Sequence, residues 1–128
     1  MSQAHRRVAL IVCAALAAGV AAVPALATNV VKIDSKVTIS TRAPAFHGRV
    51  KSDNHACETG RKVKLFKRRH GPDHLLGHDD TNRKGRWHVG VNPLSSGAYY
   101  AKVTRREEGT AGTIYVCRRD RSRTVHVD

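Results

Sequence analysis

Short runs of alternating apolar and polar residues are the feature that most constrains this fold. The run around Phe46 and Val50 shows the alternation, which returns near Val63, Trp87 and Tyr99. Successive side chains of a β-strand point to opposite faces, so a period of two predicts strands with one buried face. Clusters of Gly, Pro, Asn, Asp and Ser separate the runs. The pattern predicts an all-β domain of seven or eight short antiparallel strands, most simply a sandwich.

The alternation also sorts residues between the interior and the surface. The predicted interior positions are Phe46, Val50, Val63, Leu65, Trp87, Val89, Tyr99, Ala101 and Val103. The predicted outward positions are Arg49, Lys51, Lys62, Lys64, Arg86, His88, Lys102 and Arg106. We therefore expect positive charge spread over the outward faces of several strands.

Two stretches are predicted as connections rather than strands. Gly71-Pro72, Gly77 and Asn82 punctuate the segment 70–84, which leaves room for at most a short strand around Leu75-Leu76. The stretch 109–112 is predicted to be another turn.

The first 27 residues have the pattern of an export signal. Arg6 and Arg7 precede an apolar run from residue 8 to residue 23, and Pro24 and the small residues Ala25 and Ala27 follow it. A membrane-spanning helix needs about 20 apolar residues, and this run is shorter. We expect cleavage after Ala27, a folded domain over 28–128 and a secreted or envelope location, with a retained anchor as the alternative.

Two of the three cysteines, Cys57 and Cys117, would remain after cleavage because Cys13 lies in the signal. An even number of cysteines in an oxidising compartment predicts one disulfide. The two cysteines are 60 positions apart in the sequence. In the chain-entropy account a bond that closes a loop of this length contributes roughly 4 kcal/mol to stability. A reactive thiol or a pair of metal ligands is the alternative, although neither cysteine belongs to a CxxC pattern.

The chain is strongly basic, with a formal net charge of +13, of which only Arg6 and Arg7 leave with the signal. Such a charge attracts anionic polymers, or simply keeps a secreted domain soluble. The candidate binding residues form clusters at Lys67, Arg68, Arg69, Arg83, Lys84, Arg86, Arg118, Arg119, Arg121 and Arg123. Because export removes cytoplasmic nucleic acid as a partner, we expect anionic envelope or extracellular polymers and no specific nucleic acid.

A histidine-rich segment offers an alternative function. His70, His74 and His78 precede Asp79-Asp80, and imidazole with carboxylate suits Zn²⁺, Cu²⁺ or Ni²⁺. The spacing would align the three histidines on a helix, but Gly71-Pro72 and Gly77 argue against one. We therefore expect a solvated connection and no cofactor, with a metal-binding secreted protein as the alternative.

Catalysis has little support in the sequence. No nucleophile motif accompanies the histidines, and both mature cysteines are expected in the disulfide. The carboxylates Glu58, Glu107 and Glu108 fall in exposed, turn-like contexts rather than as a pair across a cleft. No phosphate-binding glycine loop is present. The sequence predicts a protein that is not an enzyme.

Several motifs together resemble a bacterial carboxypeptidase-regulatory-like, or transthyretin-like (prealbumin-like), domain. They are Gly48-Arg49-Val50, Gly60-Arg61-Lys62-Val63-Lys64-Leu65, Leu76-Gly77, Asp80-Thr81 with Gly85-Arg86-Trp87, and Gly97-Ala98-Tyr99-Tyr100-Ala101. The order of Asp80 and Thr81 departs slightly from the family's hairpin. The resemblance covers residues 45–127 and implies an immunoglobulin-like β-sandwich that acts as an accessory or adhesion-type module without a catalytic residue.

Overall fold

The computed structural model describes Gly19, residues 29–42 and residues 44–128. Apart from Gly19, the predicted signal and its cleavage site lie outside the described residues. Within the described residues no helix is long and apolar enough to cross a membrane.

The described chain is all-β, as the alternation predicts, and its single short helix is a 3₁₀ turn, η1 (His55–Cys57). The strands are β1 (Asn29–Ile33), β2 (Ser35–Val37), β3 (Ser40–Arg42), β4 (Ala45–Ser52), β5 (Lys62–Lys67), β6 (His74–Asp80), β7 (Arg86–Gly90), β8 (Gly97–Val103), β9 (Arg106–Thr110), β10 (Thr113–Cys117), β11 (Asp120–Arg121) and β12 (Val125–Val127). These outnumber the seven or eight expected, partly because β2, β3 and β11 are pieces of two or three residues.

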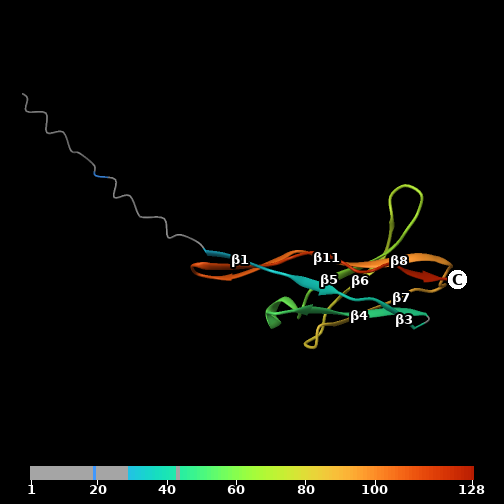
Figure 1. Ribbon diagram of the computed structural model, residues 1–128, viewed down its shortest axis with the longest axis horizontal. Coiled ribbons are helices and arrows are strands. Elements are labelled where there is room, and N and C mark those ends of the chain that lie inside the picture. Colours follow the sequence, from blue (N-terminus) through green and yellow to red (C-terminus); the bar gives the residue numbers. More distant parts are fainter. Residues whose placement is uncertain (1–18, 20–28, 43) are drawn as a thin grey trace, which may run out of the picture.

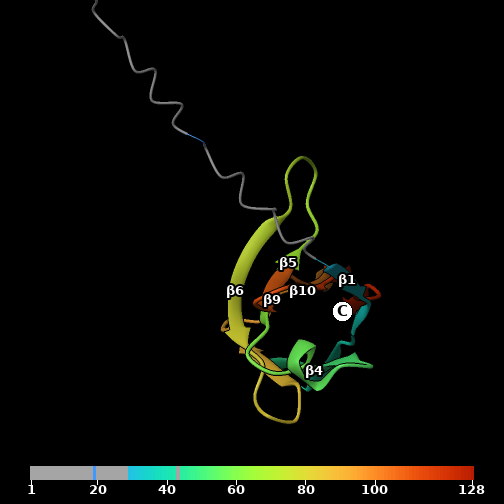
Figure 2. The ribbon, with the colours of Figure 1, turned by 90° about the vertical axis from the view of Figure 1, so that its left-hand side faces the viewer.

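Two antiparallel layers face each other. One layer has the order β11-β8-β5-β6, with β12 also paired to β8, and the other consists of β2 and β3 on one side of β4 and β7 on the other. Figure 1 shows β8 and β5 in one layer and β4, β7 and β3 in the other. In the end-on view of Figure 2, β6 curves from the first layer toward the second and closes one side.

The core between the layers contains every residue assigned to the interior by the alternation. Phe46 and Tyr99 pack ring against ring across the layers, with centroids 4.7 Å apart. Trp87 is buried, and its indole N–H donates to the Thr38 carbonyl at 3.2 Å. Gly48 allows the Thr38 carbonyl to lie this close to β4, since a Cβ atom at position 48 would meet the Thr38 carbonyl oxygen at 1.9 Å.

A third sheet, β1-β10-β9, extends from one end of the sandwich (Figure 1). Its β1 runs parallel to β10, which departs from the expected all-antiparallel arrangement. No hairpin joins β1 to β10, so no turn imposes an antiparallel direction on this pair. The predicted disulfide is confirmed: Cys117 at the end of β10 is bonded to Cys57 of η1, and both are fully buried.

Two predicted connections are strands. The segment 74–80 forms β6 because it pairs with β5 along its length, and its position at a sheet edge leaves its polar side chains in solvent. The charged segment 106–110 forms β9 by pairing with β10, so the predicted turn at 109–112 is shorter than expected. In both cases backbone pairing with a neighbour outweighs a composition typical of loops.

Candidate polyanion-binding surface

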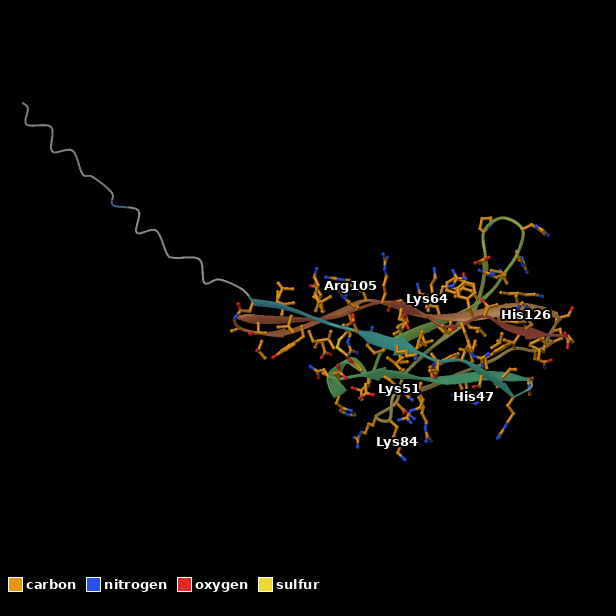
Figure 3. The ribbon with its side chains drawn as sticks, in the orientation of Figure 1. His47, Lys51, Lys64, Lys84, Arg105 and His126 are labelled. Carbon is orange, nitrogen blue, oxygen red and sulfur yellow. A yellow bond between two sulfur atoms is a disulfide. The ribbon has the colours of Figure 1, made fainter. Side chains whose placement is uncertain are left out.

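Three cations lie side by side across the outer face of the β11-β8-β5-β6 sheet. Lys64 of β5 is directly opposite Lys102 of β8, and Lys102 is directly opposite Arg121 of β11. We call Lys64, Lys102 and Arg121 the basic row. Neighbouring strands are about 4.8 Å apart, so the row concentrates positive charge over three adjacent strands. Figure 3 shows Lys64 pointing away from the second layer.

The cations of the basic row form no ion pair with an acid. Like charges directly opposite each other on a sheet are destabilising. Within the described residues, no carboxylate lies within ion-pair distance of Lys64, Lys102 or Arg121. The native fold therefore retains an electrostatic repulsion that a bound anion would relieve.

An aromatic floor supports the basic row. Phe66 and Tyr100 are stacked, with ring centroids 5.4 Å apart and planes 12° apart. The Lys102 ammonium lies 5.4 Å from the centroid of Phe66, and the Arg121 guanidinium carbon lies 3.8 Å from the centroid of Tyr100. Cations held over ring faces keep a defined position without losing their outward N–H groups. Tyr100 is 2% exposed, so its ring holds these cations rather than stacking on a ligand.

Tyr100 also fastens the loop between β5 and β6, which projects on the same side as the basic row (Figure 1). Its hydroxyl donates to Asp73 Oδ2 at 2.5 Å, and the Arg69 backbone N–H donates to Asp73 Oδ1 at 3.3 Å. The hydrogen bond from Tyr100 lowers the pKa of Asp73. Burial, and then the bond to Asp73, raise the pKa of Tyr100. The loop is thus tied to the aromatic floor through an ionised carboxylate.

The basic row borders a hollow of about 650 Å³, which we call the basic groove. Its lining residues are Lys64, Phe66, Lys102, Val103, Thr104, Arg105, Arg119, Asp120 and Arg121. Asp120 is already engaged, because its Oδ2 accepts the Val37 backbone N–H at 2.9 Å. The groove has the size of a small-ligand site and an excess of positive charge.

A fully buried arginine fixes the backbone beside the groove. Arg61 donates from Nη1 to the Cys57 carbonyl at 2.7 Å and to Ser35 Oγ at 2.8 Å. From Nη2 it donates to the carbonyls of Thr104 at 2.8 Å and Arg118 at 3.0 Å. Burial, and then the nearby charge of Arg106, lower the pKa of Arg61 to about 10, so the group is still a cation at neutral pH. Arg61 and the adjoining disulfide together hold the segments that supply Arg105 and Arg119.

The structure distributes the sequence-predicted binding residues over several places. Arg119 and Arg121 line the basic groove, and Arg118 lies beside it. Arg68 and Arg69 are exposed in the β5–β6 loop. Arg83, Lys84 and Arg86 are exposed in the tight chain reversal 82–86, which leads from β6 to β7 in the other sheet and which we call the β6–β7 hairpin. Figure 3 shows Lys84 on the side of the molecule opposite Lys64.

Two residues of the predicted set are occupied in internal contacts. Lys67 Nζ donates to Ser95 Oγ at 2.6 Å and lies over the Tyr99 ring. Arg123 Nη2 donates to the Ile39 carbonyl at 3.1 Å. Neither side chain lines the basic groove.

The groove also contains cations that were not among the sequence-predicted binding residues. Lys64 and Lys102 were expected on outward faces, but as isolated lysines in alternating strands they form no cluster in the sequence. The alternation was the available signal, since it placed both on the surface. The missing information was the register that puts Lys64 opposite Lys102.

The histidine segment does not converge on one point. His70 lies in the β5–β6 loop, whereas His74 and His78 lie on β6. The register of β6 against β5 shifts next to Leu76, so His78 pairs with Lys64 on the outer face while His74 pairs with the inward-turned Lys67. Among the described residues, no three His, Cys, Asp or Glu side chains are grouped as a metal site requires.

Comparisons with protein-family models, with curated proteins and with solved structures give no match for this chain. The class of protein is therefore defined by its own fold and surface: a disulfide-bonded, all-β sandwich with a basic groove on one outer face.

Proposed function

We propose that this protein is an exported, non-catalytic β-sandwich module that binds anionic polymers of the cell envelope or the extracellular space through the basic groove. The observation that carries the proposal is the basic row, in which Lys64, Lys102 and Arg121 are directly opposed and lie beside a hollow of about 650 Å³. A polyanion would neutralise these charges and release its counterions, which favours binding. We also propose that the domain is of the carboxypeptidase-regulatory-like type, on the motifs quoted above.

Export is part of the proposal. It rests on the N-terminal pattern of Arg6-Arg7, the apolar run and Ala25-Leu26-Ala27, together with the disulfide. Disulfides persist in oxidising compartments and are rare in the cytosol. The accessible polyanions of such compartments are wall and surface polymers and acidic glycans.

The experiment compares two matched triple charge reversals. Lys64→Glu/Lys102→Glu/Arg121→Glu removes the basic row, while Arg83→Glu/Lys84→Glu/Arg86→Glu makes the same change in net charge at the β6–β7 hairpin. Binding of heparin and of linear polyphosphate is measured by calorimetry over a range of salt concentrations. Loss of three anion contacts should make the negative slope of log affinity against log salt shallower by about 2 for the basic-row variant. The hairpin variant should keep the slope of the unmodified protein.

Thermal unfolding of both variants provides the folding control, because all six positions are at least partly exposed. Equal loss of affinity in the two variants would mean that net charge alone drives binding. A loss confined to the hairpin variant would place the binding site on the opposite face. Either result would refute the proposed site.

A further inference from the structure

A second hollow adjoins the basic groove. It has a volume of about 560 Å³ and is lined by Lys32, Arg105, Val116, Arg118 and Arg119. Arg105 and Arg119 line both hollows, so the two adjoin. Together the two hollows extend over the outer surface from β5 and β8 to strands β1 and β10 of the third sheet.

The cations of the second hollow are available to a ligand. Lys32 and Arg119 have no carboxylate within ion-pair distance among the described residues. Arg118 Nη1 lies 3.1 Å from Asp34 Oδ1, and Arg105 Nη2 lies 2.5 Å from Glu107 Oε1. All four of these side chains are more than half exposed, and such surface ion pairs contribute only about 0–1 kcal/mol. A polyanion can therefore compete for both arginines.

The two hollows are held in a fixed relation to each other. Lys32 of β1 is opposite Val116 of β10, and the Arg118 backbone N–H donates to the Ile33 carbonyl at 2.9 Å. Arg61 Nη2 bonds the Thr104 carbonyl beside the basic groove and the Arg118 carbonyl beside the second hollow. A ligand that spans both hollows would meet a surface that is already ordered, which lowers the entropic cost of binding.

We propose that the two hollows are adjoining subsites of one site for a single extended strand of a linear polyanion with phosphate-type groups along its backbone. This inference rests on the proposed function and adds the second subsite and the class of polymer. Each hollow has the volume of a ligand fragment, and the shared Arg105 and Arg119 bridge them. The planar forks of Arg105, Arg119 and Arg121 suit two-point contacts to phosphate oxygens.

The floor of the site favours a polymer that is recognised by its backbone rather than by its rings. Tyr100 lies beneath Arg121 and is 2% exposed, and the Lys102 ammonium lies over Phe66, so cations rather than bases occupy the faces of both rings. A flexible single strand can enter both hollows in turn. A duplex is too stiff to bend from one hollow into the other.

The test uses inorganic tripolyphosphate as a short probe and long linear polyphosphate as an extended one, with calorimetry giving stoichiometry and affinity. The first-hollow variant is Lys64→Glu/Lys102→Glu, and the second-hollow variant is Lys32→Glu/Arg118→Glu, so the change in charge is matched. The short probe should bind the unmodified protein at two sites and each variant at one. The long probe should bind once per protein and at least about tenfold more tightly, because the second contact becomes intramolecular. Each variant should lose that gain.

The outcomes separate this inference from the proposed function. If the second-hollow variant binds long polyphosphate as the unmodified protein does while the first-hollow variant fails, the two-subsite inference is wrong and the proposed function stands. If neither variant changes binding of either probe, both are wrong. Duplex DNA that competes as well as single-stranded DNA, at equal phosphate concentration, would overturn the assignment to a single strand. Circular dichroism and thermal unfolding of both variants verify that they fold.

Discussion

The two outer faces of the sandwich both carry basic side chains but differ in how these are arranged. On the β4 layer, Lys36 is opposite Lys51, Arg49 is opposite Arg86 and His47 is opposite His88. On the β5-β8-β11 layer, Lys64, Lys102 and Arg121 follow one another across three strands. Figure 3 shows the two sets on opposite sides, with His47 and Lys51 below and Lys64 above.

Several basic side chains on the β4 layer have acids or carbonyl oxygens as neighbours. Lys36 and Lys51 share a hollow of about 300 Å³ with Asp34 and Asp53. His88 Nδ1 lies 3.6 Å from Asp79 Oδ2, and Arg49 Nη2 donates to the Lys84 carbonyl at 3.2 Å. A high net charge does not by itself define a binding site. What distinguishes the basic groove is a row of three cations on adjacent strands, two of them over aromatic rings, beside a hollow.

The largest expected effect comes from removing the disulfide between Cys57 and Cys117. Cys57→Ser/Cys117→Ser should reduce the free energy of unfolding by about 4 kcal/mol, since the bond closes a long loop, and should weaken polyanion binding. Urea unfolding of the oxidised protein and the variant measures the loss. A change in the free energy of unfolding below about 1 kcal/mol would mean that packing around Cys57 and Cys117 holds β10 against η1 without the bond.

Removing the buried guanidinium should have the next largest effect. Arg61→Met leaves the Thr104 and Arg118 carbonyls without their donor and should destabilise the fold by about 3 kcal/mol. It should also weaken polyphosphate binding, because Arg105 and Arg119 lose their support. Arg123→Met is the matched control, since Arg123 donates one hydrogen bond to the Ile39 carbonyl, and about 1 kcal/mol is expected there. Equal effects of the two substitutions on unfolding would contradict a special role for Arg61.

Much of the fold could be predicted from the sequence, because alternation and cysteine number are local signals. The interior positions from Phe46 to Val103 and the Cys57–Cys117 bond follow from them. Only a short strand around Leu75-Leu76 could be predicted within β6, and β9 could not be predicted at all, since their polar composition resembles a loop and pairing with β5 and β10 makes them strands. The basic row could not be predicted either, because it depends on pairing between distant strands. Lys64, Lys102 and Arg121 are far apart in sequence, and long-range register brings them together.

A smaller effect of opposite sign is expected from relieving the repulsion in the basic row. Lys64→Gln removes a charge directly opposite Lys102 and should stabilise the fold by about 0.5 kcal/mol at low salt. The gain should disappear in high salt, where surface charges are screened. Lys51→Gln should give little change, because Asp34 and Asp53 lie near Lys51 and Lys36. Urea midpoints at two salt concentrations compare the variants, and an equal gain in both would remove the distinction between the faces.

The smallest expected effect is a pH dependence confined to the β5–β6 loop. Because the hydrogen bond from Tyr100 lowers the pKa of folded Asp73, its contribution is present above the ordinary aspartate pKa and is lost as pH falls through the lowered value. Because burial raises the pKa of Tyr100, its contribution is lost as pH rises through that raised value. NMR titration of the Asp73 carboxyl should give a higher pKa in Tyr100→Phe. An unchanged pKa would show that the bond is absent in solution.

We expect anionic polymers to bind the basic groove and not the β4 layer. The most direct test is an NMR titration of the unmodified, oxidised protein with linear polyphosphate at physiological salt, following backbone amides on both faces. We expect shift changes concentrated on β5, β8 and the segments 104–105 and 118–121, with little change at Lys36, Lys51 and the hairpin 82–86. Changes spread evenly over both faces, or concentrated at the hairpin, would contradict this expectation.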